Sequence, residues 1–396
     1  MCRRSAWFVA FFGMFILSWP APGLARAATL TVGQNPAVCP GALYTTIQSA
    51  VDAAASGDTI HICAGTYTEQ VSITKSLQVN GDNGAIILPA NVVGNSNSLT
   101  SGQPIAAIVL VQNTTGVTIQ NVIVDGSGNG IAACSPDPVG IYYQNASGEL
   151  NHVTVRNTEL LPPSSLGGCQ SGTGIFVQSG GGGASPVSVV KIENSRIHDY
   201  QKNGITANET GTQVTISGNV VTGLGTSAAA AQNGIQIGYG ASGTIHANTV
   251  ANHVYAPCTD DVMPCSEADD ILVYESDGVQ VDHNDVGVSQ TGIAVQANNA
   301  NVLDNTVFGS VFDGILLFGN TNKATGNLIT RSDQAGVEIS GNANTVQHEV
   351  INDAAVGVLT RAGFTGNTVS ANTYYNTPVT TQDPPANAAR RASPYR

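Results

Sequence analysis

The sequence has 396 residues, with 14 Lys or Arg against 27 Asp or Glu, so its formal net charge is −13. Only 10% of the residues are charged, against about a quarter in an ordinary soluble domain, while 42% are hydrophobic and 45 are glycine. This composition excludes coiled coils and helical bundles, and the excess of acid excludes a nucleic-acid partner, which would be repelled. The glycines follow no triplet period, which excludes collagen, and the many Val and Ile argue against general disorder. A fold of short strands and turns remains.

Residues 1–27 have the pattern of an export signal. Arg3 and Arg4 precede an apolar stretch from Trp7 to Trp19, and Ala25-Arg26-Ala27 supplies a small-residue cleavage site. The apolar stretch is too short to span a bilayer, and no later segment is long and apolar enough to do so. We therefore expect a secreted or periplasmic protein without membrane insertion, and we favour a monomer.

Six cysteines follow the signal, an even number that suits disulfides in an oxidising compartment. Six cysteines allow 15 pairings, so the connectivity stays open. The spacing favours three sequential bridges, Cys39–Cys63, Cys134–Cys169 and Cys258–Cys265. No cysteine or histidine cluster has zinc-finger spacing.

The first element expected after the signal is a short helix at about 46–55. Ile47, Val51 and Ala54 lie on one helical stripe, and Gly57 supplies a stop signal.

A short apolar alternation that begins with a small residue then repeats from about residue 105 to 370. Its clearest copies start at Gly292, Gly314, Gly336 and Gly357, which are 22, 22 and 21 residues apart. Self-similarity at such a period is typical of a solenoid. Earlier copies have uneven gaps, as expected if loops are inserted between coils; they start at Gly140, Gly174, Gly204, Gly234 and Asp270.

A second set of strands ends at asparagine. The copies end at Asn121, Asn157, Asn194, Asn219, Asn248, Asn284, Asn305 and Asn327. Asparagine tolerates the left-handed conformation of a tight corner, and its amide can bond to the same amide in the next coil. The pattern therefore predicts an asparagine ladder.

With these two columns the chain resembles the right-handed parallel β-helix proteins of the pectate-lyase-like superfamily. The start fits as well, from Thr46 through Gly57-Asp58-Thr59-Ile60 to Gly65-Thr66-Tyr67-Thr68-Glu69. The expected fold is all-β, a single-stranded right-handed parallel β-helix over residues 28–375 with about eleven coils. The helix at 46–55 would cap its open end, because a terminal coil otherwise exposes apolar surface and strand edges. Residues 376–396 are expected to form a flexible tail.

Most catalytic motifs of that superfamily are absent. The segment from Gly65 to Glu69 matches part of the pectin methylesterase-like pattern, but the motifs that should follow it are missing, so we interpret Glu69 as associated with the fold. The Gly-His-Gly and Arg-x-Lys motifs of polygalacturonase-like enzymes and the Asp-Pro-His-Asp motif of mannuronan epimerase-like enzymes do not occur. A thioether-rich copper site is disfavoured because only Met263 follows the signal.

Side chains alternate along each strand, so every second residue of the repeat is expected to face solvent. Stacked coils would turn these positions into columns in which aromatic rings stand beside amides, a combination that suits a sugar chain. The alternative is a set of tolerated surface residues, with aromatics present because they favour strands. The predicted substrate-binding residues are Tyr142, Gln144, Phe176, Gln178, Asn208, Gln236, Tyr274, Gln296 and Phe318.

An acidic segment lies beside these columns, between His253 and Asp277. Asp269 and Asp313 share a column two coils apart, near the carboxylate spacing of an inverting glycosidase. Candidate catalytic residues are Asp269, Asp270, Asp313 and Lys202, the last as the base of a lyase. Asp260, Asp261 and Glu267 could hold Ca²⁺, which takes oxygen ligands. The alternatives, which we favour, are a solvated acidic loop and, for Lys202, a surface charge.

Two functions follow as hypotheses. The first is an exported β-helix protein that binds an extracellular polysaccharide and, as a lyase or glycoside hydrolase, cleaves it. The second is a non-catalytic β-helix that binds polysaccharide or a cell-surface partner through the same face.

Overall fold

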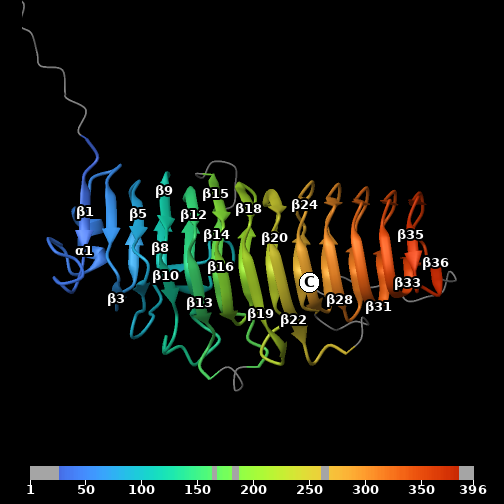
Figure 1. Ribbon diagram of the computed structural model, residues 1–396, viewed down its shortest axis with the longest axis horizontal. Coiled ribbons are helices and arrows are strands. Elements are labelled where there is room, and N and C mark those ends of the chain that lie inside the picture. Colours follow the sequence, from blue (N-terminus) through green and yellow to red (C-terminus); the bar gives the residue numbers. More distant parts are fainter. Residues whose placement is uncertain (1–25, 163–166, 181–186, 260–266, 383–396) are drawn as a thin grey trace, which may run out of the picture.

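The computed structural model describes residues 26–162, 167–180, 187–259 and 267–382. Almost every element is a strand, and nearly all strand pairs are parallel. The chain winds into successive coils, each of which adds strands to three faces of a rod. The coils follow one another along its long axis from β1 to β36 (Figure 1). The predicted parallel β-helix is confirmed.

The first face is a 13-stranded sheet with one strand from each coil, two more than the eleven coils expected. Its strands are β1 (Thr29–Val32), β2 (Thr59–Ile62), β5 (Gln78–Gly81), β9 (Val117–Gln120), β12 (Gly148–Asn151), β15 (Ser188–Glu193), β18 (Thr212–Ser217), β21 (Ser242–His246), β24 (Gln280–Asp282), β27 (Asn301–Leu303), β30 (Lys323–Thr325), β32 (Thr345–Gln347) and β34 (Thr368–Ser370).

The second and third faces join into one 23-stranded sheet. The second face contains β3 (Gly65–Tyr67), β6 (Ala85–Ile87), β10 (Ile123–Asp125), β13 (Thr154–Thr158), β16 (Arg196–Tyr200), β19 (Val220–Ser227), β22 (Thr249–Tyr255), β25 (Asp285–Ser289), β28 (Thr306–Ser310) and β35 (Thr373–Tyr375). The third face contains β4 (Val71–Ile73), β8 (Pro104–Gln112), β11 (Asp137–Gln144), β14 (Thr173–Gln178), β17 (Asn203–Asn208), β20 (Asn233–Gly238), β23 (Asp269–Tyr274), β26 (Thr291–Gln296), β29 (Asp313–Leu317) and β36 (Val379–Gln382). Two long strands run through both faces, β31 (Leu328–Ile339) and β33 (Val350–Thr360), and β7 (Ser96–Asn97) pairs antiparallel with β8.

The helix α1 (Ile47–Ala53) lies at the first end of the rod, as predicted (Figure 1). Its buried residues Ile47, Ala50 and Val51 belong to the main core. Glu69 accepts hydrogen bonds from the backbone N–H groups of Ile47 and Gln48 at 2.7 and 2.9 Å. A carboxylate is favourable at a helix N-terminus, so these bonds support the structural role expected for Glu69.

The core is one continuous stack of Ile and Val side chains from successive coils. The glycine that opens each repeat is required by close approach rather than by its backbone angles. A Cβ on Gly292 would lie 2.5 Å from Val307 Cγ1 and 2.6 Å from the carbonyl oxygen of Gly314. This position therefore points into a crowded corner of the coil, where a side chain fits only if the neighbours leave room for it.

The asparagine ladder is confirmed at one corner of the coil. The Nδ2 of each asparagine donates to the Oδ1 of the next one at 2.9–3.0 Å, in four bonds that run from Asn219 through Asn248, Asn284 and Asn305 to Asn327. The left-handed residue is the one before each ladder position, for example His283 at φ 56° and Asp304 at φ 53°. Of the two predicted reasons for asparagine at this corner, the left-handed conformation is wrong for the ladder and the amide-to-amide bond is confirmed. The amide also satisfies buried backbone groups, such as the N–H of Asn284.

The first three expected members lie outside this ladder. Asn121, Asn157 and Asn194 themselves adopt the left-handed conformation, at φ 58°, 58° and 51°. Asn121 and Asn194 occupy the turn position instead, and Ser195 takes the ladder position after Asn194, where its N–H donates to Asn219 Oδ1. Asn157 lies within β13 on the second face, and the left-handed turn residue of its coil is His152, at φ 53°. Further ladders at another corner were not predicted; the more exposed one consists of Asn298, Asn320 and Asn342.

The buried ladder continues into a glutamate. Glu349 is fully buried and accepts bonds from the N–H and Nδ2 of Asn327, yet burial raises the pKa of its carboxyl from 4.5 to about 8. From pH 4.5 to about 8 the native state keeps a proton that the unfolded state loses, so stability falls as pH rises through this window.

We expect Glu349→Gln to abolish that fall and to raise the free energy of unfolding at pH 9 by on the order of a few kcal/mol. Denaturant unfolding from pH 4 to pH 9 measures this, with the exposed Glu275→Gln as control; equal pH profiles for wild type and Glu349→Gln would contradict it.

Two of the predicted disulfides are present, Cys39–Cys63 and Cys134–Cys169. The third, Cys258–Cys265, stays a prediction because Cys265 lies outside the described residues. The expected signal at 1–27 lies almost wholly outside them too, and so does most of the expected tail. Within the described ranges, no helix has the length and apolar character needed to cross a membrane.

Candidate functional site

The third face of the rod holds the predicted columns in the predicted register. Tyr142 pairs with Phe176, Phe176 with Thr206, and the column continues strand by strand through Gln236, Leu272, Ala294 and Leu316. The neighbouring column is Gln144, Gln178, Asn208, Gly238, Tyr274 and Gln296. Neighbouring strands lie roughly 4.8 Å apart, so each column presents one side chain per coil at that interval.

Solvent exposure of the first part of these columns was predicted wrongly, because the segment that contains β7 covers it. Tyr142 is fully buried, stacks on Phe176 with ring centroids 4.9 Å apart, and donates to Gln178 Oε1 at 2.7 Å. Gln178 accepts a bond from the N–H of Leu99, and Gln144 donates to the carbonyl of Asn97. The amides predicted to bind sugar here bind the protein's own loop.

The columns are also buried further along the rod. Leu272, Ala294 and Leu316 are 1–2% exposed and form an apolar cluster with Tyr274, against which the partly buried Phe318 packs. Gln296, in the neighbouring column, is buried as well. The middle column of this stretch is apolar because three consecutive coils carry aliphatic residues there.

Between these two stretches, β17 and β20 carry a network of amides and hydroxyls, in which Asn208 is partly exposed and the other members, Asn203, Thr206, Asn233 and Gln236, are buried. Asn203 Nδ2 donates to Thr206 Oγ1 at 2.9 Å and to Gln236 Oε1 at 3.1 Å. Gln236 Nε2 in turn donates to Asn208 Oδ1 at 3.1 Å, and Asn233 Nδ2 lies 3.4 Å from Gln236 Oε1. These bonds hold the amides in fixed orientations. The sequence analysis predicted two members of this network, Asn208 and Gln236, and missed Asn203, Asn233 and Thr206. A signal was present for Asn203 and Asn233, because each directly precedes the glycine of its repeat. The predicted Asp269 has the same place, directly before Asp270, which replaces that glycine.

Two tyrosines border this amide network. Tyr239, 44% exposed, follows β20 directly and lies edge to face with Tyr274, with ring centroids 5.1 Å apart. Tyr239 was not predicted, because it lies just beyond the columns. Its exposed ring provides the kind of apolar surface that a sugar ring can stack on.

Asp269 and Lys202 lie at the other border. Asp269 pairs with Asn233 on one side and Thr291 on the other, and the register continues to Asp313, so the predicted common column is confirmed. Lys202 precedes β17 and donates to the carbonyl of Ala231. Burial lowers its pKa from 10.5 to about 8, against the opposing effect of the Asp269 charge. An amine with this pKa can act as a base close to neutral pH.

Asp270 lies inside the coil and not on the outer face where it was predicted. It occupies the column of the repeat glycine, pairs through Oδ1 with His253 Nδ1 at 2.6 Å, and is fully buried. His253 Nε2 contacts the Tyr200 hydroxyl, which makes a buried Tyr200–His253–Asp270 chain. Burial lowers the pKa of His253 to about 3 and raises that of Asp270. Because all three side chains are enclosed, Asp270 cannot contact a polysaccharide on the outer face.

The calcium site is not assembled by the described residues. Asp260 and Asp261 lie outside them, and Glu267 is buried with its Oε2 accepting a bond from Thr291 Oγ1 at 2.7 Å. Groups of three His, Cys, Asp or Glu close enough for one ion occur in the described ranges at two places, His61/Cys63/Asp82 and His246/Asp282/His283. Neither includes Glu267.

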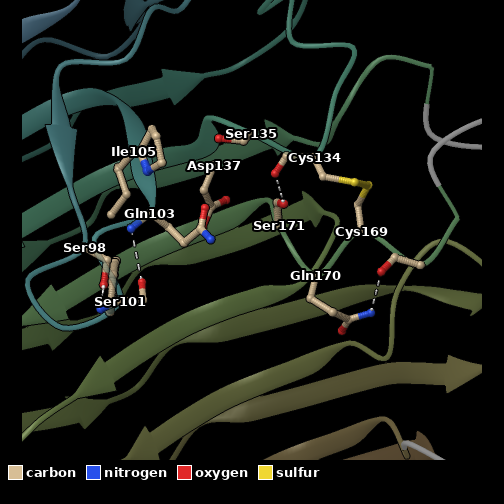
Figure 2. Close-up of a pocket in the computed structure, with 13 residues that line it drawn as sticks. Ser98, Ser101, Gln103, Ile105, Cys134, Ser135, Asp137, Cys169, Gln170 and Ser171 are labelled. Carbon is tan, nitrogen blue, oxygen red and sulfur yellow. Dashed lines mark hydrogen bonds between the residues drawn. A yellow bond between two sulfur atoms is a disulfide. The ribbon is translucent and has the colours of Figure 1, made fainter.

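A pocket of about 510 Å³ opens beside Phe176, between the segment after β7 and the Cys134–Cys169 bridge (Figure 2). Asp137 lines it, accepts a bond from the Gly172 N–H at 2.6 Å, and has its pKa raised by burial to about 7. Phe176 pairs with Thr206, so the pocket adjoins the amide network. The sequence analysis did not select Asp137, although its place at the start of a repeat strand was a usable signal.

A family model described as "Right handed beta helix region" matches residues 106–374. The chain therefore belongs to the right-handed β-helix family. No curated protein matches.

Several solved structures share the fold. A GH136 lacto-N-biosidase from Eubacterium ramulus is 13% identical, with a TM-score of 0.60 over 88% of this chain and 68% of that one. PfbA, a surface adhesin of Streptococcus pneumoniae, is 14% identical, with a TM-score of 0.58 over 86% of this chain and 89% of that one. The Dettilon tailspike protein is 12% identical, with a TM-score of 0.56, and the match covers 83% of this chain and 64% of the tailspike. At these identities the likeness establishes the fold.

Proposed function

We propose that this protein binds an extracellular polysaccharide across β14, β17, β20 and β23. The observation that carries the proposal is the row of oriented amides on consecutive strands, Asn203, Asn233, Gln236 and Asn208, with a pocket at one end. A sugar unit in an extended glycan advances by about one strand spacing, roughly 4.8 Å, so successive hydroxyls can meet successive coils. Tyr239 supplies an exposed ring at the border and is held there by its edge-to-face contact with the buried Tyr274.

Three further observations support a glycan partner and an exported protein. The polar groups are already bonded to one another, so little side-chain entropy is lost when a ligand replaces those bonds. The two disulfides suit an oxidising compartment. The similar structures include a lacto-N-biosidase and a surface adhesin.

Purified protein without residues 1–27 should be tested against pectate, alginate and neutral glycans, with and without Ca²⁺, by affinity electrophoresis and calorimetry. For the glycan that binds, Gln236→Ala should weaken affinity by about tenfold, because it removes a group bonded to both Asn203 and Asn208. Gln213→Ala on the first face is the matched control, since Gln213 is an exposed amide remote from the row. No binding to any glycan, or equal losses for the two variants, would contradict the proposal.

Lys202 beside Asp269 favours a second candidate function, cleavage of the bound chain by a lyase. With a pKa of about 8, Lys202 could remove a proton from a uronate, and Asp269 would position the amine through its charge. Asp313, two strands further along the same column, would be the second carboxylate of the hydrolase alternative. Absorbance near 235 nm detects unsaturated products and a reducing-end assay detects hydrolysis; loss of product with Lys202→Met and Asp269→Asn, but with unchanged glycan affinity, is the expected outcome for an enzyme.

A further inference from the structure

A cluster of two histidines and a carboxylate lies on the first face, at the corner where β21 and β24 end. Asp282 Oδ2 is 2.6 Å from His246 Nδ1 and 2.9 Å from His283 Nδ1. The two rings meet edge to face with centroids 5.4 Å apart. Both histidines thus direct the same ring nitrogen at the same oxygen atom.

The chemistry of these donors suits a transition metal better than calcium. Imidazole nitrogen with one carboxylate oxygen is a typical ligand set for Zn²⁺, and Ca²⁺ prefers oxygen alone. In a tetrahedral zinc site, donor atoms about 2.0–2.1 Å from the ion lie roughly 3.3 Å from one another. Each nitrogen needs to move outward from Asp282 Oδ2 by less than about 1 Å to reach that nitrogen–oxygen separation, and the three donor atoms already lie within 4.8 Å of one another. The His246 and His283 side chains are 49% and 58% exposed, so they can make this movement.

The backbone under the cluster is fixed. His246 and Asp282 are paired residues of neighbouring strands in parallel register. Asn284, directly after His283, belongs to the buried asparagine ladder. Asp282 has its other oxygen, Oδ1, bonded to Gln280 Nε2 at 2.9 Å, which leaves Oδ2 directed at the two rings.

The other group of this kind does not offer the same chemistry. His61, Cys63 and Asp82 are close together, but Cys63 is bonded to Cys39 in a disulfide and has no thiolate to give.

We propose that His246 Nδ1, His283 Nδ1 and Asp282 Oδ2 form a binding site for a divalent transition-metal ion, with Zn²⁺ as the expected occupant and water as the fourth ligand. The ion would join two coils whose ligands are 36 residues apart in the chain, across the long connection between β22 and β23. The site lies on a different face from the amide row, so the bound ion would cross-link two coils and would take no part in the glycan site.

The test uses untagged protein without residues 1–27, freed of metal with a chelator and titrated with zinc chloride alone by calorimetry. We expect one zinc ion per chain and a rise in the unfolding temperature with zinc. His246→Gln and His283→Gln should each weaken binding by about 100-fold or more. Histidine NMR should show zinc on Nδ1 rather than Nε2, which follows from the orientation of both rings.

His198→Gln is the matched control. His198 also pairs with a carboxylate, through Nδ1 to Asp199 at 2.6 Å, but is not one of the three-residue groups in the described part of the chain. The His198→Gln variant should bind zinc as the wild type does. Absence of stoichiometric binding to the wild type, or equal losses for His198→Gln and His246→Gln, would overturn the proposal. Because zinc binding is measured without glycan, it can fail or succeed independently of the proposed function.

Discussion

Replacing Asn305 by alanine should lower the free energy of unfolding by about 3–5 kcal/mol, because buried backbone and side-chain groups lose their partners together. Asn305 accepts bonds from the N–H and Nδ2 of Asn284, and it donates to Asn327 Oδ1 and to the carbonyl of Val281. Alanine restores none of these bonds, and water has no access to the corner. Chemical denaturation followed by circular dichroism measures the loss.

Asn320→Ala is the matched control, since Asn320 forms similar coil-to-coil bonds, with Asn298 and Asn342, at an exposed corner. Water can replace those bonds, so the expected loss is within about 1 kcal/mol. Equal losses at the two corners would show that burial does not set the strength of the ladder.

Asp270→Ala should cost a similar amount, about 3–5 kcal/mol, while Asp270→Asn should cost less than about 1 kcal/mol. Alanine leaves the Nδ1 of a fully buried His253 without its partner. Asparagine keeps the shape and an acceptor oxygen for that nitrogen. It suffices because burial keeps His253 uncharged, with a pKa of about 3, so no buried cation needs an anion.

These two variants also separate structure from function. Asp270→Asn should bind glycan as the wild type does, because the Tyr200–His253–Asp270 chain is enclosed in the coil. Glycan binding lost in a stable Asp270→Asn protein would mean that the interior chain communicates with the outer face. Equal stability losses for Asp270→Ala and Asp270→Asn would instead show that His253 needs a charged partner.

Much of the fold could be predicted because each coil repeats the same local requirements. The register follows from three repeated features: glycine at the crowded corner, alternating Ile and Val, and asparagine at the ladder. The strand pairs confirm this register, for example Ile293 with Ile315. Two of the first ladder positions, at Asn121 and Asn194, were misplaced by one residue, because asparagine fits both the left-handed turn residue and the ladder, and its identity alone cannot distinguish the two.

The candidate site was harder to predict, because alternation shows which side of a strand a residue faces and not what lies over it. Tyr142 faces outward as expected, yet the segment around Leu99 covers this part of the face. The prediction for Asp270 was wrong for a different reason. Asp270 fits an inward column only because His253 and Tyr200, which are 17 and 70 residues earlier in the chain, shape the space around it. Both outcomes depend on contacts between segments distant in the sequence.

The ladder also separates the part of each coil that has a fixed length from the part that can vary. Consecutive ladder residues from Asn219 to Asn327 are 29, 36, 21 and 22 positions apart, yet the same pair of bonds joins each of them to the next. The extra residues enter away from the ladder corner, for example in the connection between β22 and β23, which leads onto the third face. Insertions and deletions can therefore remodel the rim of the binding face while the coil spacing stays unchanged, so that ligand preference can evolve without loss of the scaffold.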